Sequence, residues 1–299
     1  MKPAPFSYVR PAQPSDVVAE LVAADAGQGG KVIAGGQSLM PVLAMRLGRP
    51  GVLVDVTGVE NFKRVGITGD YLSIGAGVRQ RAVERNHTGS VPLLGRAIPW
   101  IGHREIRSRG TVCGSIAHAD PSAELPAVAA CLDAEIVVMG REGVRTVSAR
   151  DFFVGAMTTQ LSSTDVLSSV RFPTARPGDG FGFGEVARRH GDFALAGVAI
   201  HVAVKNSDVR EATVVSFGVS DRPQVRDMTG ALREAVRGDG ADPDIERNLD
   251  DPVWEMARDV VTAPDDVQAT TEYRQRLIAV QTKRELVRAY RQARKSETT

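Results

Sequence analysis

The apolar and polar positions of the first sixty residues predict short buried strands separated by helices. Residues 17–22 have the spacing of an amphipathic helix, with Ser15 as the expected N-cap. The apolar runs at 31–34 and 52–56 are typical of short buried strands. Between them, a glycine pair leads into a helical pattern at 39–45. We therefore expect a βαβ-sized unit near the N-terminus.

From about residue 58 the pattern changes to strands separated by turns, with helices between them. Strands are expected at 64–68, 71–75 and 134–139, and helices near 79–86, 93–99 and 122–132. This mixture predicts an α+β domain.

A stretch rich in proline and glycine at 172–180 marks the expected domain boundary. Beyond it, the pattern predicts strands at 201–204 and 212–217, then a helical tail around 227–237, 253–260 and 267–292. The predicted domains are residues 1–175, with subdomains of about 1–57 and 58–175, and residues 176–299.

The composition fits a two-domain protein and excludes several classes of function. A length of 299 residues is sufficient for two buried cores. The net charge of +1, with both signs interspersed, argues against a nucleic-acid partner. Two cysteines cannot hold an iron–sulfur cluster or a zinc ribbon. The N-terminus lacks an apolar signal core and no apolar run could span a membrane, so we expect a cytoplasmic protein.

Two glycine-containing turns give the strongest indication of ligand chemistry. They are Ala34-Gly35-Gly36-Gln37-Ser38 and Thr111-Val112-Cys113-Gly114-Ser115. Glycine permits positive φ and a close approach of the backbone to a ligand, and successive amides form a nest that binds anions. The first turn also lies between a predicted strand and a predicted helix, where such nests occur. Together the turns predict a clamp for a phosphorylated cofactor.

Other motifs favour structural roles. The segment Tyr71–Gln80 begins like a dinucleotide fingerprint, but Gln80 stands where the third glycine belongs. Gly29-Gly30-Lys31 lacks the remaining residues of a P-loop, so nucleoside triphosphate hydrolysis has no support. The five histidines are scattered, which argues against a metal site in this chain. Cys113 is expected to be a packing residue.

Residues 107–126 combine glycines, hydroxyls, arginines and carboxylates in one loop-rich segment before a helix. Asp120 and Pro121 are explained by capping of the helix expected at 122–132. Capping leaves the glycine and hydroxyl cluster unexplained.

Three segments carry a family resemblance: Ala34–Leu39, Arg109–Pro121 and Arg188–Ala196. They resemble the two flavin loops and the start of the C-terminal domain in the FAD-binding medium subunits of molybdenum hydroxylases, which include carbon monoxide dehydrogenase and xanthine dehydrogenase. The resemblance covers nearly the whole chain. It implies a two-part FAD-binding domain of the p-cresol methylhydroxylase/vanillyl-alcohol oxidase type. A smaller C-terminal α+β domain with an antiparallel sheet and helices would follow.

The resemblance also implies site residues. Amides and hydroxyls of the two loops would hold the FAD pyrophosphate without any cationic side chain. Glu124 matches a carboxylate that faces the flavin ring, Leu167 an apolar flavin contact, and Phe193 an aromatic residue near the ring. Cys113 replaces a frequent glycine and would be strained at a positive φ. No catalytic residue and no metal ligand is implied, and the FAD-binding set is Ala34, Gly35, Gly36, Gln37, Ser38, Thr111, Val112, Cys113, Gly114, Ser115, Asp120, Glu124, Leu167 and Phe193.

The resemblance implies a heteromeric complex. A large subunit with a molybdenum-pterin cofactor would oxidise the substrate with water, and a small subunit would carry two [2Fe–2S] clusters. FAD in this chain would deliver the electrons to an external acceptor. The expected assembly is a dimer of heterotrimers. The substrate stays open among carbon monoxide, an aldehyde and an N-heteroaromatic compound, and so does the acceptor.

Three alternatives stay open at this point. A free-standing FAD-dependent oxidoreductase of the same fold would need a site for proton transfer, and no clustered His, Tyr or Lys residues suggest one. A nicotinamide-dependent dehydrogenase is disfavoured by the missing third glycine at Gln80. A flavin-less assembly or scaffold protein would be colourless when purified.

Overall fold

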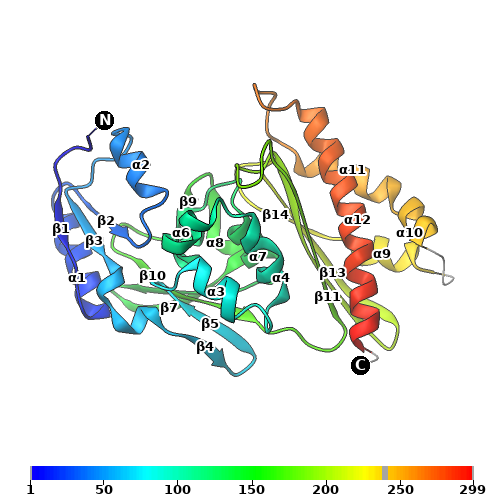
Figure 1. Ribbon diagram of the computed structural model, residues 1–299, viewed down its shortest axis with the longest axis horizontal. Helices are drawn as coiled ribbons and strands as arrows, with labels where there is room; N and C mark the ends of the chain where they lie inside the picture. The colour runs from blue at the N-terminus through cyan, green and yellow to red at the C-terminus, as the bar shows by residue number, and fades with distance from the viewer. Residues whose placement is uncertain (1, 238–241, 298–299) are drawn as a thin grey trace. The chain divides into compact units, whose positions relative to one another are not determined.

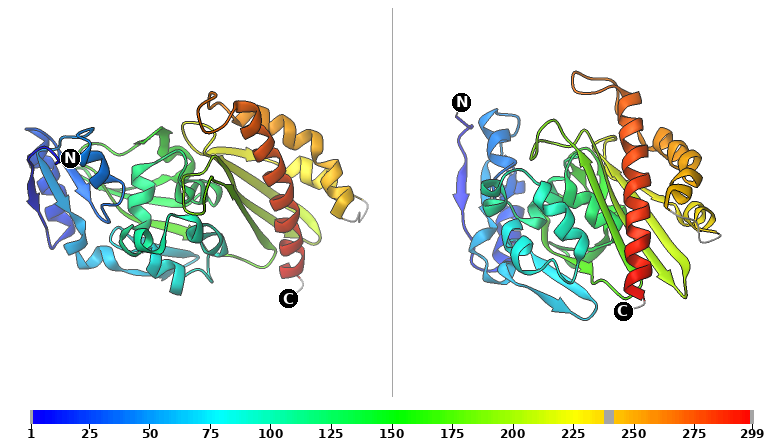
Figure 2. Two further views of the ribbon diagram at one scale, coloured as in Figure 1. Left: turned by 45° about the horizontal axis from the view of Figure 1, so that its top comes forward. Right: turned by 45° about the vertical axis from the view of Figure 1, so that its right-hand side comes forward.

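The computed structural model describes residues 2–237 and 242–297, which form two compact units (Figures 1 and 2). Unit 1 contains the described residues up to His87, together with His103–Ala119 and Ala134–Pro173. Unit 2 contains Thr88–Gly102, Asp120–Asp133 and the described residues from Thr174 onward. Two segments from the first 175 residues therefore belong to unit 2. A functional division of the chain at residue 175 stays a prediction.

Unit 1 begins with a small parallel sheet, which confirms the predicted βαβ unit. Its strand order is β1-β3-β2, with β1 (Ser7–Val9), β2 (Gly30–Ile33) and β3 (Val52–Asp55). Helix α1 (Pro14–Asp25) packs on β2 and β3 and buries Val17 and Leu21 (Figure 1). Helix α2 (Leu39–Ala44) follows the first glycine turn. Because β2 and β3 run parallel, their carboxyl ends lie at the same edge of the sheet.

The expectation that Ser15 caps α1 is wrong. The helix begins at Pro14, so the N-cap is Gln13, whose backbone is extended and whose side chain forms no capping hydrogen bond. Proline suits the first helical position because its φ is already helical and its missing N–H would be unpaired there. Ser15 lies inside the first turn, where its hydroxyl donates to the Asp16 carboxylate at 3.3 Å.

The second sheet of unit 1 is antiparallel and holds most of the remaining core. Its order is β4-β5-β10-β6-β7, with β4 (Val65–Thr68), β5 (Tyr71–Gly75), β6 (Glu135–Gly140), β7 (Gly143–Ser148) and β10 (Val166–Pro173). Val170 lies opposite Ile74 on one neighbour and Ile136 on the other, and all three side chains are buried. The other elements of unit 1 are η1 (Val56–Gly58), η2 (Glu60–Lys63), α3 (Gln80–Asn86), α5 (Arg104–Arg109), α6 (Val112–His118), α8 (Ala149–Phe152), β8 (Phe153–Gly155) and β9 (Thr158–Thr159).

Unit 2 is an antiparallel sheet covered by helices. The sheet runs β11-β12-β13-β14, with β11 (Asp179–Val186), β12 (Ala196–Lys205), β13 (Asp208–Phe217) and β14 (Gln224–Asp227). The long helix α12 (Thr271–Glu297) packs along β11 and β12, and α11 (Asp250–Val260) packs against it (Figure 2). The other helices are α4 (Pro92–Ala97), η3 (Ile98–Trp100), α7 (Glu124–Cys131), α9 (Thr229–Ala235) and α10 (Asp242–Asn248).

Glycines in β11 explain both the close approach of α12 and why this strand was not predicted. A Cβ at Gly180 would come within 1.9 Å of the Ala289 carbonyl oxygen, and one at Gly182 within 2.6 Å of the Glu285 carbonyl oxygen. Glycine at alternate positions gives the strand one flat face on which the helix backbone can lie. In the sequence, the same glycines resemble a turn. The predicted strands at 201–204 and 212–217 and the helical tail are confirmed.

Among the described residues, no helix combines the length and the apolar character needed to cross a membrane. Within the same part of the chain, no group of three or more His, Cys, Asp or Glu side chains could hold a metal ion. Both cysteines are buried, and neither is part of a disulfide.

Candidate functional site

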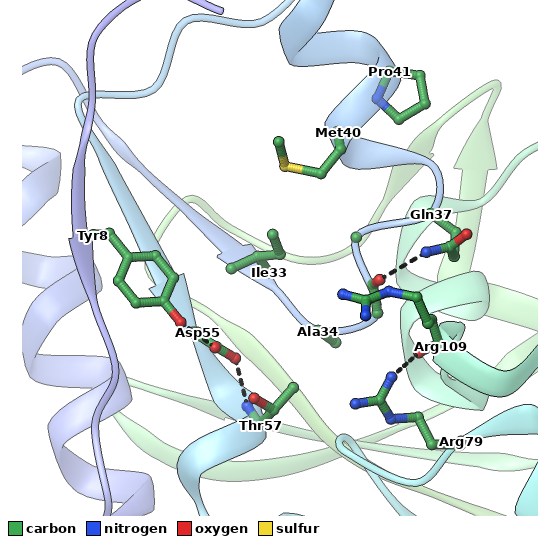
Figure 3. Close-up of a pocket in the computed structure, with 12 residues that line it drawn as sticks. Tyr8, Ile33, Ala34, Gln37, Met40, Pro41, Asp55, Thr57, Arg79 and Arg109 are labelled. Atoms are coloured by element: carbon green, nitrogen blue, oxygen red, sulfur yellow. Dashed lines mark hydrogen bonds between the residues drawn. The ribbon is translucent and has the colours of Figure 1, made fainter. Parts of the chain in front are cut away.

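A cavity of about 540 Å³ in unit 1 lies beside the first glycine turn (Figure 3). Its walls come from the middle of β1, the end of β3, the turn between β2 and α2, the residue before α3 and the last residue of α5. The lining residues are Tyr8, Ile33, Ala34, Gly35, Gly36, Gln37, Met40, Pro41, Asp55, Thr57, Arg79 and Arg109.

Glycine is required at both positions of the pair in this turn. A Cβ at Gly35 would lie 2.3 Å from the Arg109 carbonyl oxygen and 2.7 Å from the Gly110 Cα. Gly36 has a φ of 71°, which side-chain-bearing residues rarely adopt. Within the described residues, the amides of residues 35–38 donate no hydrogen bond. The turn therefore offers a row of unpaired N–H groups next to the cavity.

Two arginines line the same cavity. The Arg79 guanidinium donates to the Arg109 carbonyl oxygen at 2.7 Å, and the Arg109 side chain lies beside the turn (Figure 3). Neither residue was assigned to the site from the sequence, because nothing local in the sequence shows that residues thirty apart converge. Their positions in the sequence were the one available indication of a role at the site. Arg79 follows the Gly75/Gly77 pair, and Arg109 precedes the second glycine turn.

The opposite side of the cavity carries an acidic group. The Tyr8 hydroxyl donates to one oxygen of Asp55, and the Thr57 amide donates to the other at 2.8 Å (Figure 3). The Arg10 Nε lies 3.6 Å from Asp55. Burial alone would raise the pKa of Asp55, but these hydrogen bonds and the charge of Arg10 hold it below its ordinary value. Asp55 and Tyr8 were also missed by sequence analysis.

The second glycine turn is the start of helix α6, within a segment that the sequence pattern predicted to be loop-rich. Its role in holding the cofactor stays a prediction. Thr111 is the N-cap, and its hydroxyl accepts from the Gly114 amide at 3.0 Å. The Val112 amide donates to the Val78 carbonyl and the Ser115 amide to the Thr111 carbonyl. Most of these amides are therefore already paired. The two loops are close in space: a Cβ on Gly114 would lie 3.9 Å from the Ala34 Cβ.

Cys113 is a buried helical residue, so the strain considered for a positive φ at this position does not arise. Its thiol donates to the Ile74 carbonyl oxygen at 3.3 Å. Burial raises the pKa of Cys113 to about 12, which keeps the thiol protonated. The residue therefore packs α6 onto β5.

The remaining expected site residues are distributed over both units. In unit 1, Leu167 is buried in β10 opposite Val138. In unit 2, Phe193 is 72% exposed between β11 and β12. The sequence predicted that Asp120 caps the helix that is α7 in the structure, and this prediction is wrong. The N-cap is Ala123, and the Asp120 carboxylate instead accepts from the Ser122 amide at 2.9 Å.

Glu124 lies in the first turn of α7 and is 7% exposed. Its negative charge acts on Glu185 of β11, which belongs to the same unit. Burial first, and Glu124 second, raise the pKa of Glu185 to about 8. Both carboxyl oxygens of Glu185 are buried without a hydrogen-bond partner in the described residues.

Comparison with known families covers nearly the whole chain. Residues 4–175 match the family described as the FAD binding domain in molybdopterin dehydrogenase. Residues 182–289 match the carbon monoxide dehydrogenase flavoprotein C-terminal domain. This chain belongs to the FAD-binding medium subunits of the molybdenum hydroxylases. The family resemblance, the fold class and the FAD cofactor predicted from the sequence are thereby confirmed.

Individual medium subunits and related structures agree with this family. The chain is 33% identical to the nicotine 6-hydroxylase medium subunit of Paenarthrobacter nicotinovorans, covering 97% of this chain and 99% of that protein. It is 32% identical to caffeine dehydrogenase subunit beta of Pseudomonas sp. (strain CBB1), covering 97% and 96%. The structure of quinoline 2-oxidoreductase from Pseudomonas putida 86 is similar with a TM-score of 0.86, at 30% identity and covering 98% and 99%. As a medium subunit, the chain is the flavoprotein component of an oxidoreductase.

The cavity suits the phosphates of FAD. Unpaired amides and guanidinium groups are the donors that bind phosphate oxygens, through hydrogen bonds and through charge. Here both kinds of donor border the same cavity. FAD accepts two electrons and releases them singly or in pairs, which is the chemistry the bound group supplies.

Proposed function

We propose that this medium subunit holds the FAD pyrophosphate between the turn at residues 34–38 and the start of α6. The supporting observation is the row of unpaired amides at residues 35–38 beside Arg79 and Arg109. The amides supply partial positive charge at fixed positions, and the arginines supply two full charges. Within the second loop, the proposed contacts come from residues 111–115, with Asp120 nearby in the chain.

We further propose roles at the flavin ring for Glu124, Leu167 and Phe193, which the family resemblance implies. A carboxylate near the ring would oppose the accumulation of negative charge on it and so lower its reduction potential. Leu167 and Phe193 would exclude water from the ring through apolar surface. None of the three is assigned a proton-transfer step on the organic substrate. The flavin domain is proposed to end near residue 175 and the C-terminal domain to follow it.

The proposed role of the chain is electron transfer within a larger complex. Its two cysteines are buried and cannot form a cluster, so electrons have to come from a partner. We infer a small subunit with [2Fe–2S] clusters as the donor, a large molybdenum-pterin subunit that oxidises the substrate, and an external acceptor. The proposed assembly is a cytoplasmic dimer of heterotrimers.

The substrate class is selected in the large subunit, and the relatives suggest where to begin. The names of two similar proteins include caffeine and nicotine, and a similar structure is named for quinoline. N-heteroaromatic compounds are therefore the first class to test. Other relatives are named for glyceraldehyde and carbon monoxide, so an aldehyde and carbon monoxide form the second set.

The first experiment measures flavin in the purified full-length chain by absorption before and after denaturation. We expect one FAD per chain in the wild type and loss of FAD in Gly36→Asp, which places a carboxylate in the phosphate nest. Gly69→Asp is the matched control, because Gly69 also has a positive φ of 58° but has nothing within 4 Å. A colourless wild-type chain that also fails to bind added FAD would overturn the proposal and favour the scaffold alternative.

The electron-transfer role is tested on the assembled complex. When substrate is added in the absence of oxygen, the iron–sulfur clusters should be reduced first. The visible absorption of the oxidised flavin should then decrease. A complex that turns over substrate while the flavin stays oxidised would contradict the proposed electron path.

A further inference from the structure

The position of Asp55 in the fold points to a specific role at the cavity. Asp55 ends β3, twenty residues after Gly35 in the turn that follows β2. The two strands are parallel neighbours, with Ile33 opposite Asp55, so both the turn and the carboxylate lie at the same edge. In parallel sheets that bind dinucleotides, a carboxylate about 20 residues after the phosphate-binding turn binds ribose hydroxyls. The topology here offers the same pairing of phosphate turn and acid.

The contacts of Asp55 fit a ribose diol. A carboxylate has about four positions at which it can accept hydrogen bonds. The Tyr8 hydroxyl and the Thr57 amide each use one, and they fix the orientation of the group. The side chain is 13% exposed and lines the cavity, so further positions are accessible from it. Because the hydrogen bonds keep the pKa of Asp55 low, the group is an acceptor at neutral pH.

The residues around Asp55 offer a surface for a base. The ring of Tyr8 and the side chains of Ile33 and Met40 lie on the same side of the turn as Asp55, away from Arg79 and Arg109 (Figure 3). The cavity therefore has two arginines at one end, a central row of amides, and at the other end Asp55 with apolar neighbours and with the Arg10 Nε at 3.6 Å. This order matches diphosphate followed by ribose and base.

We propose that Asp55, positioned by Tyr8, binds the ribose hydroxyls of the adenosine half of FAD and so selects the dinucleotide over FMN. The inference rests on the proposed phosphate site at the glycine turn. Asp55 is the binding residue, and Tyr8 acts through it as a positioning residue. FMN, which lacks the adenosine half, would leave this end of the cavity empty.

The test uses the full-length chain freed of bound flavin, with binding measured by calorimetry. The probes are FAD, FMN, ADP and 2′,3′-dideoxyadenosine diphosphate, which lacks both ribose hydroxyls. We expect the wild type to bind ADP at least tenfold more tightly than the dideoxy compound, because hydrogen bonds to a charged acceptor would be lost. FAD is expected to bind at least tenfold more tightly than FMN.

Variants of Asp55 and Tyr8 test whether these residues cause the difference in affinity between ADP and its dideoxy analogue. In Asp55→Asn the ratio between ADP and its dideoxy analogue is expected to fall to within about threefold, with little change for the dideoxy compound. Tyr8→Phe keeps the ring and should lower the same ratio in part. Asp151→Asn, an exposed aspartate in the same unit, should leave the ratio unchanged.

The outcomes separate the two proposals. A wild-type chain that binds FAD but does not distinguish ADP from its dideoxy analogue would overturn the role of Asp55 and leave the phosphate site standing. The role of Asp55 is equally overturned if Asp55→Asn binds FAD and keeps the full ratio. A wild-type chain that binds neither FAD nor ADP would overturn the proposed function itself. The comparison of analogues on the wild type needs no variant, so it holds even if Asp55→Asn fails to fold.

Discussion

Each unit of the protein contains polar groups that have no partner among the described residues, but the two places differ in access. In unit 1, the amides of residues 35–38 border an open cavity. In unit 2, Glu185 is 6% exposed as a residue, and both of its carboxyl oxygens are buried. An accessible donor can be satisfied by a ligand or by water. Burying an ionised carboxylate without a partner costs free energy. Glu185 avoids this cost by keeping its proton, and its pKa is therefore raised.

The largest expected effect is the pH dependence of stability that the buried Glu185 causes. The pKa of Glu185 is about 8 in the folded chain, above the ordinary value of 4.5. The folded state therefore holds more protons than the unfolded state between these values, so stability falls as the pH rises through that window. The full loss is on the order of 5 kcal/mol. Glu185→Gln cannot ionise, and we expect it to be more stable than the wild type at pH 8.

Urea unfolding at a series of pH values between about 5.5 and 8.5 measures this difference. The wild-type curve should decline with pH, and the Glu185→Gln curve should be flatter. Glu255→Gln removes an exposed carboxylate from α11 of the same unit and should follow the wild type. Parallel curves for wild type and Glu185→Gln would show that Glu185 is ionised throughout.

The next effect in size concerns the shape of the open turn. In Gly35→Ala the new Cβ would lie 2.3 Å from the Arg109 carbonyl oxygen, so the backbone has to move. We expect a loss of about 3 kcal/mol in the free energy of unfolding, together with loss of FAD. Urea unfolding and flavin absorption measure the two results. Gly66→Ala is the control, since nothing lies within 4 Å of its Cβ. Full FAD content in Gly35→Ala would mean that the turn does not bind the cofactor.

The turn and the sheet around it could be predicted from the sequence because their signals are local. A β-leaning run, a glycine pair and a helical pattern follow one another within fifteen residues, and β2 and α2 lie where this order places them. The cavity opposite the turn could not be predicted. Tyr8 and Asp55 are 47 residues apart, and Arg79 and Arg109 are 30 apart. Only the packing of separate elements brings these pairs together.

Local signals were also misleading at particular positions. The glycines of β11 resemble breakers, yet the strand needs them because α12 lies against them. Residues 111–115 resemble part of a loop in the sequence, yet they begin helix α6, where the Thr111 hydroxyl accepts a capping hydrogen bond from the Gly114 amide. The raised pKa of Glu185 could not be predicted from the sequence, because it depends on burial and on Glu124, which lies 61 positions earlier in the chain. The β11 strand and the pKa of Glu185 depend on residues that are distant in the sequence, and the start of α6 depends on hydrogen bonds within the turn.

Removing one cation from the cavity is expected to weaken FAD binding without affecting stability. A charge-assisted hydrogen bond contributes about 1.5–3 kcal/mol, so Arg109→Ala should raise the Kd for FAD by about tenfold or more. Arg79→Ala should act in the same direction and also removes the hydrogen bond to the Arg109 carbonyl. Titration of the flavin-free chain measures both. Arg104→Ala, an exposed arginine at the start of α5, is the control.

The effect of Arg109→Ala should shrink at high salt, because salt screens interactions between exposed charges. A variant that binds FAD as tightly as the wild type at low salt would show that the amides suffice without a cationic side chain, as the family resemblance implies.

The smallest expected effect distinguishes the two glycine loops from each other. Thr111 caps α6 through the Gly114 amide, whereas Ser38 at the start of α2 forms no capping hydrogen bond. Thr111→Ala should therefore cost about 1 kcal/mol in the free energy of unfolding, and Ser38→Ala should change it by less than about 0.5 kcal/mol. Thr111→Ser keeps the acceptor and should recover part of the loss. Suppose that Ser38→Ala lowers the free energy of unfolding of the flavin-free chain as much as Thr111→Ala does. The Ser38 side chain would then already accept from amides of the first turn, and those amides would not be available to a ligand.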